Sequence, residues 1–446
     1  MSNLVEEPAT TSAPSAGERI LRIHGGNVLR GTVDISGAKN AALKALAASL
    51  LTNEEVVLHN VPMIADVVSM ADLLRAFGAT VEIDRGREKV TIRATEITTT
   101  EAHPSLFRAT RASVVVTGPM LARAGGISFA MPGGDRIGKR PIDMHLRGFQ
   151  RMGAVIEHTE TGITARVDGL RGARIYMDYP SHTGTEAILM ASTLATGTTV
   201  IVNASMEPEI VWLGTMLNRM GARIAGLGTP ILTIDGVERL HGVSEFVIPD
   251  RLEAATYAIA AVITGGEITL GRVHEPHLLP ITEKLLEAGA EVWTREDRML
   301  VRAGRELRAV DIQTLPFPGF PTDSQSTFVP LLTQAEGVAI VHERVYEDRL
   351  RYTDELNRMG ADIRVQRWGD QGEFRATSAE IHGPTRLHGA RVTALDIRSA
   401  VSVVLAGLVA EGITEMDEVH HIDRGYADFV NKMSSLGADI QDTVPG

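Results

Sequence analysis

Six apolar, alanine-rich segments recur along the chain, and each ends in a turn that leads into a short strand-like run. Their apolar residues surround most of the helical circumference instead of forming one stripe, which is typical of buried helices. We therefore predict a buried helix followed by a strand in each segment. The segments span residues 41–58, 112–129, 187–202, 254–270, 326–341 and 400–416.

An amphipathic helix is predicted downstream of each apolar segment, and the dipeptide Gly-Ala closes it. Glycine at this place favours the left-handed conformation that ends many helices, and a β-rich run usually follows. The glycines are Gly78, Gly153, Gly221, Gly289, Gly360 and Gly437, at intervals of 75, 68, 68, 71 and 77 residues. Six such dipeptides with the same upstream partner indicate an internal repeat.

The repeat predicts the fold class. Each unit contains a buried helix, a strand, an amphipathic helix with its Gly-Ala cap, and a further strand. Six units predict an α/β protein with two domains of three units each. A chain of 446 residues with 44% hydrophobic residues can bury cores of that size.

The overall composition argues against nucleic acid or a membrane as a partner. The formal net charge is −12 and only 4% of residues are aromatic, so a global positive field is absent and stacking platforms are few. The longest apolar run, residues 400–410, is far shorter than the ~20 residues that cross a bilayer. Residues 1–19 lack the features of a signal peptide and are predicted to be a disordered leader. We expect a cytoplasmic protein.

Cationic residues recur at equivalent points of the unit. Three stand at the starts of buried helices and three precede amphipathic helices: Lys39, Arg111 and Arg398, then Arg140, Arg349 and Arg424. Helix N-termini carry free N–H groups and the positive end of the helix dipole, so they favour anions. If these helices start on one side of their domain, the cations form a receptor for phosphate or carboxylate groups.

The segment PGGDRIGKRP, residues 132–141, nearly matches a nucleotide-binding P-loop. Its glycine and lysine spacing fits, but Arg140 stands where a Ser or Thr hydroxyl would hold Mg²⁺. We interpret the segment as a glycine-rich anion loop of another kind. Pro141 is expected to start the next helix, which leaves Asp135 exposed near the end of the loop.

The pair His420-His421, with Asp423 close by, is a candidate metal motif. Adjacent residues of a strand point to opposite faces. We therefore predict no metal site here.

Together these residues resemble the enolpyruvyl transferases, in particular the branch that acts on a nucleotide sugar. The resemblance runs from about residue 20 to the C-terminus. It rests on SGAKNAAL, TRAS, PGGDRIGKRPIDMH, SHTGTE, EPEIV, GFPTDSQ, YEDRLRY, DIRSA and HIDRGY, in the family's order. It implies two domains, each with three βαβαββ units around buried helices. Domain one would comprise residues 20–38 and 249–446, and domain two residues 39–248 with the Asp135 loop.

The implied reaction moves the enolpyruvyl group of phosphoenolpyruvate to the 3′-hydroxyl of UDP-N-acetylglucosamine and releases phosphate, for peptidoglycan synthesis. It needs no metal, no organic cofactor and no obligate protein partner. Lys39, Arg140 and Arg424 would hold the phosphate and carboxylate, with Arg111 and the catalytic Arg398 nearby. Asp323 would take the proton of the sugar hydroxyl. The other expected substrate contacts are Asn40, Pro141, Ile142, Asp143, Met144, Ser181, Thr183, Tyr346 and Arg349.

The chain departs from many family members at Asp135, where they carry a cysteine assigned to general-acid work and alkylated by fosfomycin. A carboxyl group can donate a proton only if substrate charge or desolvation raises its pKa from about 3.9. We predict that Asp135 acts in this way and that the protein is insensitive to fosfomycin.

Two alternatives stay open. An enzyme of the same fold could use shikimate 3-phosphate, although the glycine-rich loop and HIDRGY follow the nucleotide-sugar branch. A catalytically weak paralogue could keep the UDP-N-acetylglucosamine pocket, and Asp135 gives this alternative some weight.

Overall fold

The computed structural model of the protein describes residues 19–135, 137–138, 140–368 and 375–444. The predicted leader lies outside the described residues up to residue 18, as do Arg136 and Lys139 of the glycine-rich loop. Arg19, the last residue of the predicted leader, is anchored by ion pairs to Asp423 and Asp442. The prediction of disorder is therefore wrong at Arg19.

Each apolar segment forms a buried helix, as predicted. Most of their side chains are buried because the segments carry small and apolar residues on nearly every face, although the last three residues of α4 are only half-buried. Within the described residues, none of the helices is long and apolar enough to span a membrane. The helices are α1 (Lys39–Ala48), α4 (Thr117–Ala124), α6 (His182–Ser192), α8 (Arg251–Ile263), α10 (Thr322–Leu332) and α12 (Ile397–Gly407). In the second unit, α3 (Pro104–Ala109) and a 3₁₀ segment (Arg111–Val116) precede α4.

An amphipathic helix precedes each Gly-Ala dipeptide. These helices are α2 (Ala65–Ala76), α5 (Asp143–Arg151), α7 (Pro208–Arg219), α9 (Glu275–Glu287), α11 (Thr353–Arg358) and α14 (Phe429–Ser435). Each glycine lies two residues beyond its helix with φ between 98° and 103°, so the prediction of left-handed glycines is confirmed. Helix α5 begins at Asp143, so the expectation that Pro141 starts it is wrong: Ile142, just before the helix, has non-helical backbone angles.

The described strands form six sheets, one for each unit. The simplest unit runs β9, α6, β10, α7, β11, β12, and its sheet has the order β11-β12-β10-β9. The first two strands pair in parallel across a helix, whereas the last two return antiparallel. These strands are β9 (Arg174–Tyr176), β10 (Thr198–Val202), β11 (Arg223–Ala225) and β12 (Ile231–Asp235).

Two further sheets need no strand from outside their unit. One has the order β17-β18-β20-β19, and the other, β6-β8-β7, has a single parallel bridge from Glu101 to Ser128 in place of a first strand. Their strands are β17 (Ile312–Gln313), β18 (Gly337–His342), β19 (Asp362–Trp368), β20 (Arg375–Gly383), β6 (Gly126–Phe129), β7 (Val155–His158) and β8 (Ile163–Arg166).

Two units exchange their first strands. Strand β2 (Arg30–Asp34) pairs in parallel with β14 (Glu267–Gly271), while β13 (Val243–Phe246) pairs in parallel with β3 (Glu55–His59). The two sheets are completed by β15 (Glu291–Arg295) and β16 (Arg298–Arg302), and by β4 (Thr80–Asp84) and β5 (Lys89–Arg93). The connecting segments touch where they cross, because Gly37 forms a bridge with Pro249. A Cβ on Gly37 would lie 1.7 Å from the Asn60 carbonyl oxygen, so only glycine fits this crossing.

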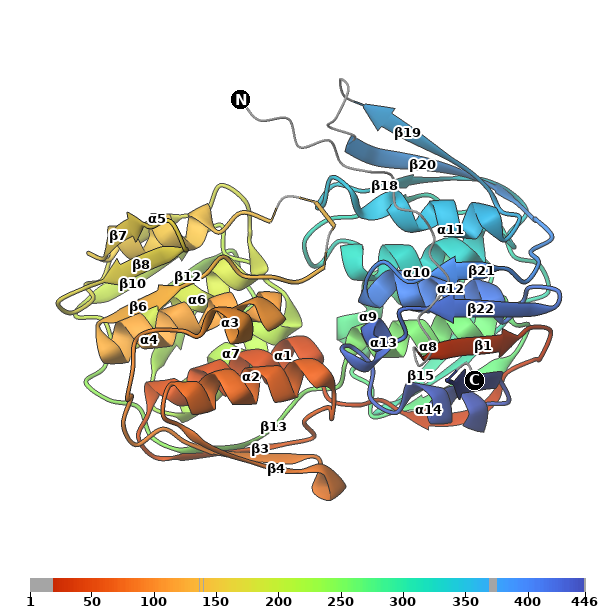
Figure 1. Cartoon of the computed structure of the whole chain (residues 1–446). Helices are drawn as coiled ribbons and strands as arrows, with labels where there is room; N and C mark the ends of the chain where they lie inside the picture. The colour runs from red at the N-terminus through yellow and green to blue at the C-terminus, as the bar shows by residue number, and fades with distance from the viewer. Residues whose placement is uncertain (1–18, 136, 139, 369–374, 445–446) are drawn as a thin grey trace.

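The N-terminal strand closes the last sheet. Strand β1 (Ile20–His24) lies between β22 (Ile413–Asp417) and β23 (Asp439–Thr443), and β21 (Arg391–Thr393) completes the sheet. In Figure 1, β1 is the red strand among the blue elements of the C-terminal part.

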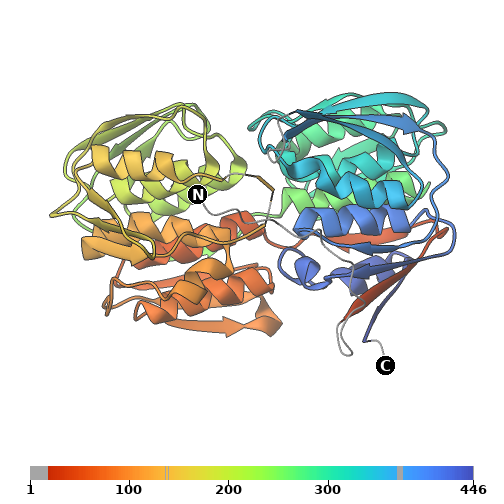
Figure 2. The same cartoon turned by 45° about the horizontal axis from the view of Figure 1, so that its top comes forward.

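The buried apolar residues form two cores. One core, which defines the central half, runs from Ala38 to Val247. The other, which defines the discontinuous half, joins Leu21–Ile35 to Ala254–Ile440. The two halves lie side by side (Figures 1 and 2). Ala38 already belongs to the central core, one residue before the predicted crossing at Lys39.

Candidate active site

One carboxylate organises the starts of two buried helices from different halves. Asp250 Oδ2 accepts a hydrogen bond from the Lys39 backbone N–H at 3.0 Å, at the first residue of α1. Its Oδ1 accepts from the N–H groups of Leu252 and Glu253 at 2.8 and 3.1 Å, which caps α8. The starts of α1 and α8 therefore meet at the crossing of the two chain segments.

Four charged side chains form the first cluster, and it joins the two halves. Lys39 Nζ lies 2.7 Å from Asp66 Oδ2, and Asp66 Oδ1 lies 3.1 Å from Arg424 Nε. Arg424 Nη1 then reaches Asp135 Oδ1 at 2.6 Å. Arg424 belongs to the discontinuous half, whereas Lys39, Asp66 and Asp135 lie in the central half. The cluster balances two cations with two carboxylates.

The surroundings of Asp135 hold it in the ionised state. Burial raises the pKa of its carboxyl group, but the charges of Arg424, Lys39 and Arg140 outweigh this and leave the pKa below its ordinary value. Its side chain is only 18% exposed. The expectation of an exposed Asp135 is therefore wrong, because Arg424 draws the carboxylate toward the other half. Burial also lowers the pKa of Lys39, although Asp66 opposes the effect.

The second cluster surrounds Asp323 in the first turn of α10. Arg349 Nη2 donates a hydrogen bond to Asp323 Oδ1 at 2.6 Å, and Arg398 Nη2 lies 3.8 Å from Oδ2. Arg398 Nη1 also donates to the Tyr426 hydroxyl at 2.8 Å. Burial raises the pKa of Asp323, but Arg349 and Arg398 outweigh it and hold the pKa far below its ordinary value. The carboxylate is ionised and restrained.

The glycine-rich loop meets the discontinuous half at Tyr346. The Arg140 guanidinium lies over the Tyr346 ring at 5.6 Å, and the Arg349 guanidinium lies 5.4 Å from the same ring. Arg111 donates hydrogen bonds to the carbonyl oxygens of Arg140 and Pro132, which fixes both ends of the loop. Burial and the charge of Arg140 lower the pKa of Arg111 to about 10.

The remaining predicted residues lie in the central half. Asn40 is the second residue of α1, and Ser181 caps α6 by accepting a hydrogen bond from Gly184 N–H at 3.2 Å. Thr183 Oγ1 contacts His145 Nε2 at 3.1 Å. Ile142 is buried, Met144 packs on the central core, Asp143 pairs with Arg147 at the surface, and Pro141 is exposed. Within the described part, no hydrogen bond or ion pair joins Asp143, Ser181 or Thr183 to either cluster.

Comparison with known proteins now identifies the family. The sequence profile of the EPSP synthase family (3-phosphoshikimate 1-carboxyvinyltransferase) matches residues 23–433. UDP-N-acetylglucosamine 1-carboxyvinyltransferase 2 of Carboxydothermus hydrogenoformans is 48% identical over 421 residues, which cover 94% of this chain and 98% of the relative. The chain belongs to the enolpyruvyl transferase family.

Further relatives of this enolpyruvyl transferase agree with that assignment. UDP-N-acetylglucosamine 1-carboxyvinyltransferase of Magnetococcus marinus is 46% identical over 94% of this chain and 98% of its own length. The crystal structure of the enolpyruvyl transferase NikO from Streptomyces tendae superposes with a TM-score of 0.85 at 27% identity, covering 96% of this chain and all of that one. EPSP synthase of Acinetobacter baumannii, at 18% identity with a TM-score of 0.73 over 96% and 100% of the two chains, shares the fold. The predicted family and the fold of six βαβαββ units are confirmed.

Several charged residues at the contact between the two halves of the transferase were not predicted from its sequence. Asp66 is buried, contacts Lys39 and Arg424, and accepts a hydrogen bond from Thr110 Oγ1 at 3.3 Å. The available signal was an aspartate in the apolar stretch IADVV, at the start of an amphipathic helix. Arg251 and Glu209 form a second missed contact between the halves, at 2.9 Å with both side chains buried.

Proposed function

We propose that this transferase moves the enolpyruvyl group of phosphoenolpyruvate to the 3′-hydroxyl of UDP-N-acetylglucosamine and releases phosphate, in peptidoglycan precursor synthesis. Relatives at 44–48% identity over 92–94% of the chain, all named for that acceptor, support this choice. The similarity to EPSP synthase structures, at 17–18% identity, favours the shikimate 3-phosphate alternative much less. A cytoplasmic location and roles in cell shape and division stay predictions.

The observation that carries the proposal is the first cluster, in which cations of both halves meet between carboxylates. Phosphoenolpyruvate brings a phosphate and a carboxylate, and each needs cationic partners in a place with little water. Lys39, Arg140 and Arg424 would supply them, with Arg111 and Arg398 nearby. Binding of these groups would displace Asp135 from Arg424, because one guanidinium edge cannot serve two anions equally well.

The reaction requires two proton transfers in its first step. The sugar oxygen bonds to C2 of phosphoenolpyruvate as its hydroxyl loses a proton, while C3 gains a proton. A tetrahedral ketal that still carries the phosphate results. The C2–O bond to phosphate then breaks and C3 loses a proton, which restores the double bond. Fixed cations around the ketal stabilise its negative charges, usually the largest contribution of an active site.

Asp323 would take the hydroxyl proton and Asp135 would act as an acid. Asp323 is a weak base while Arg349 and Arg398 both face it, so substrate that draws Arg398 away would raise its basicity. When Asp135 is released from Arg424 and lies beside a bound phosphate, the negative charge of the phosphate would act on it in place of the positive charge of Arg424. Its pKa would rise, and it could then hold the proton that an acid must donate.

The test is phosphate release by the purified protein with phosphoenolpyruvate and one acceptor at a time. Release with UDP-N-acetylglucosamine but not with shikimate 3-phosphate is expected. The reverse preference would contradict the proposal. Tight binding of UDP-N-acetylglucosamine without phosphate release would instead favour the catalytically weak paralogue.

A further inference from the structure

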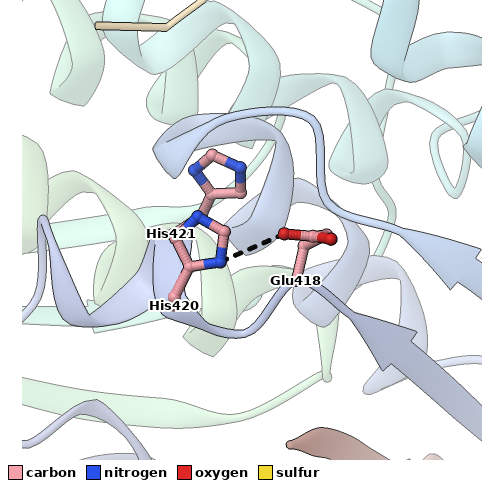
Figure 3. A group of neighbouring side chains, drawn as sticks. All are labelled: Glu418, His420 and His421. Atoms are coloured by element: carbon pink, nitrogen blue, oxygen red, sulfur yellow. Dashed lines mark ion pairs between the residues drawn. The ribbon is translucent and has the colours of Figure 1, made fainter. Parts of the chain in front are cut away.

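Glu418, His420 and His421 form a compact group of potential metal ligands outside the two clusters (Figure 3). The sequence prediction rejected a metal here because it placed the two histidines on opposite faces of a strand. That placement is wrong, because they begin the short helix α13 (His420–Asp423) directly after the turn that follows β22. In this conformation their imidazole rings lie side by side, with centroids 4.2 Å apart.

The three side chains converge closely enough for one ion. One ligand atom from each lies within 4.8 Å of the others. His420 Nδ1 is 3.1 Å from Glu418 Oε2, and Figure 3 shows these two groups pointing toward each other. Ligand pairs around a tetrahedral zinc ion lie about 3.3 Å apart, given metal–ligand bonds of about 2.0–2.2 Å. Small side-chain rotations would therefore bring all three atoms to bonding distance.

A second observation concerns His421. Its Nδ1 atom is buried and, among the described residues, has no hydrogen-bond partner. A buried polar nitrogen without a partner is destabilising, and histidine most often resolves this through a hydrogen bond, a water or a metal. His420 and Glu418 are more than half and about half exposed, so an ion and its remaining water ligands could enter from solvent.

We propose that Glu418, His420 and His421 bind one divalent ion of the zinc class. Two imidazoles and one carboxylate suit Zn²⁺ and Ni²⁺, whereas Mg²⁺ and Ca²⁺ prefer oxygen ligands. Because Asp423 ends α13 and Arg424 follows it, a bound ion would tether the end of β22 to the helix that leads to Arg424. Metal binding at this site does not require the proposed transfer reaction.

The experiment measures Zn²⁺ binding to the metal-free full-length protein by calorimetry, with Mg²⁺ as the comparison ion. One Zn²⁺ per chain is expected, with affinity reduced about tenfold or more in His420→Ala and in Glu418→Gln. Co²⁺ in place of Zn²⁺ should give visible absorption bands that the same two variants lose. Addition of Zn²⁺ should also raise the melting temperature of the wild type but not that of His420→Ala.

The matched control is the second histidine pair of the chain. His274, just before α9, and His277, in its first turn, have ring centroids 4.3 Å apart. The double variant His274→Ala/His277→Ala should leave Zn²⁺ binding unchanged. Loss of binding in this control instead of in His420→Ala would overturn the proposal. So would a wild type that binds no Zn²⁺ at micromolar concentrations, or one that binds Mg²⁺ equally well.

Discussion

Arg424 and Asp135 form an ion pair of 2.6 Å between the two halves of the protein. Arg424 also contacts Asp66, which holds Lys39, so the cluster of cations is neutralised by the protein's own carboxylates. Asp66 is buried and has several partners, whereas Asp135 lies on the glycine-rich loop. Asp135 is therefore the carboxylate that we expect an anionic substrate group to replace at the lowest cost.

Binding of phosphoenolpyruvate should be accompanied by proton uptake. Asp135 is ionised in the free protein because its pKa is held below the ordinary value. If the substrate phosphate takes its place on Arg424, as proposed, that pKa should rise, and near neutral pH the carboxylate should take up as much as about one proton. Calorimetry in two buffers of different ionisation enthalpy measures this number. Asp135→Asn should bring it close to zero.

A control variant separates this effect from a general change of charge. Asp72 lies exposed on α2 and pairs with Arg75, so Asp72→Asn should keep the proton uptake of the wild type. If Asp135→Asn takes up as many protons as the wild type, another group titrates and the role of Asp135 is wrong.

Replacement of Asp135 by cysteine should create sensitivity to fosfomycin. A carboxylate is a poor nucleophile toward an epoxide, so the wild type should keep its activity during incubation with the drug. Arg424 and Lys39 would favour the thiolate of a cysteine at this position, and the thiolate is the reactive form. The measurement is time-dependent loss of activity together with the mass of the protein.

Asp72→Cys provides the matched control, because Asp72 is about half exposed and pairs with Arg75 instead of Lys39 or Arg424. It should keep full activity in the presence of the drug. Covalent inactivation of the wild type would contradict the prediction, as would an active Asp135→Cys variant that resists the drug.

The repeat could be predicted because its signals are local. A left-handed residue after a helix favours glycine strongly, so Gly78 and its five counterparts mark the helix ends without any knowledge of the fold. The turn after the second strand gives a weaker signal. Asn60, Asn203, Arg272 and Glu418 all adopt positive φ there, but only the asparagines are residue types that commonly do so.

The contacts that build the site could not be predicted in this way, because they join segments distant in sequence. The exchange of β2 and β13 leaves the residue pattern of each strand unchanged and alters only the strand with which it pairs. Asp66 has no sequence neighbour that reveals its contact with Arg424. The cationic residues themselves were found because helix starts recur in each unit, but their distribution between the Asp66 and Asp323 clusters depends on how the two halves meet.

Arg349 should position Asp323 through its two-pronged contact with Asp323 and Thr322, at 2.6 and 3.2 Å. Lysine keeps the charge but loses the fixed fork, so Arg349→Lys should lower kcat about tenfold or more while the KM for UDP-N-acetylglucosamine changes less. The weaker contact also raises the pKa of Asp323, so the acidic limb of the kcat–pH profile should move to higher pH.

Arg351→Lys is the control for this prediction. Arg351 is exposed two residues away and pairs with Asp348 at 2.6 Å, so its replacement should leave kcat and the pH profile unchanged. An equal effect of the two substitutions would show that Arg349 acts only through the stability of the segment.

The buried pair Glu209–Arg251 should make stability depend on pH in the acidic range. Burial raises the pKa of Glu209, but Arg251 and His182 outweigh it and hold the pKa at about 2, against an ordinary value of 4.5. The stabilisation is therefore complete above pH 4.5 and is lost as the pH falls toward 2. Glu209→Gln leaves Arg251 buried without its charge partner. Near neutral pH it should lower the free energy of unfolding by about 3–5 kcal/mol, and with it the melting temperature. The substitution should also reduce the fall in stability between pH 4.5 and 2.

Calorimetric melting at several pH values tests both effects, with Glu291→Gln as the control. Glu291 pairs with Arg302 at the surface, where such a pair contributes about 0–1 kcal/mol. If the two variants melt alike at every pH, the buried pair does not stabilise the contact between the halves.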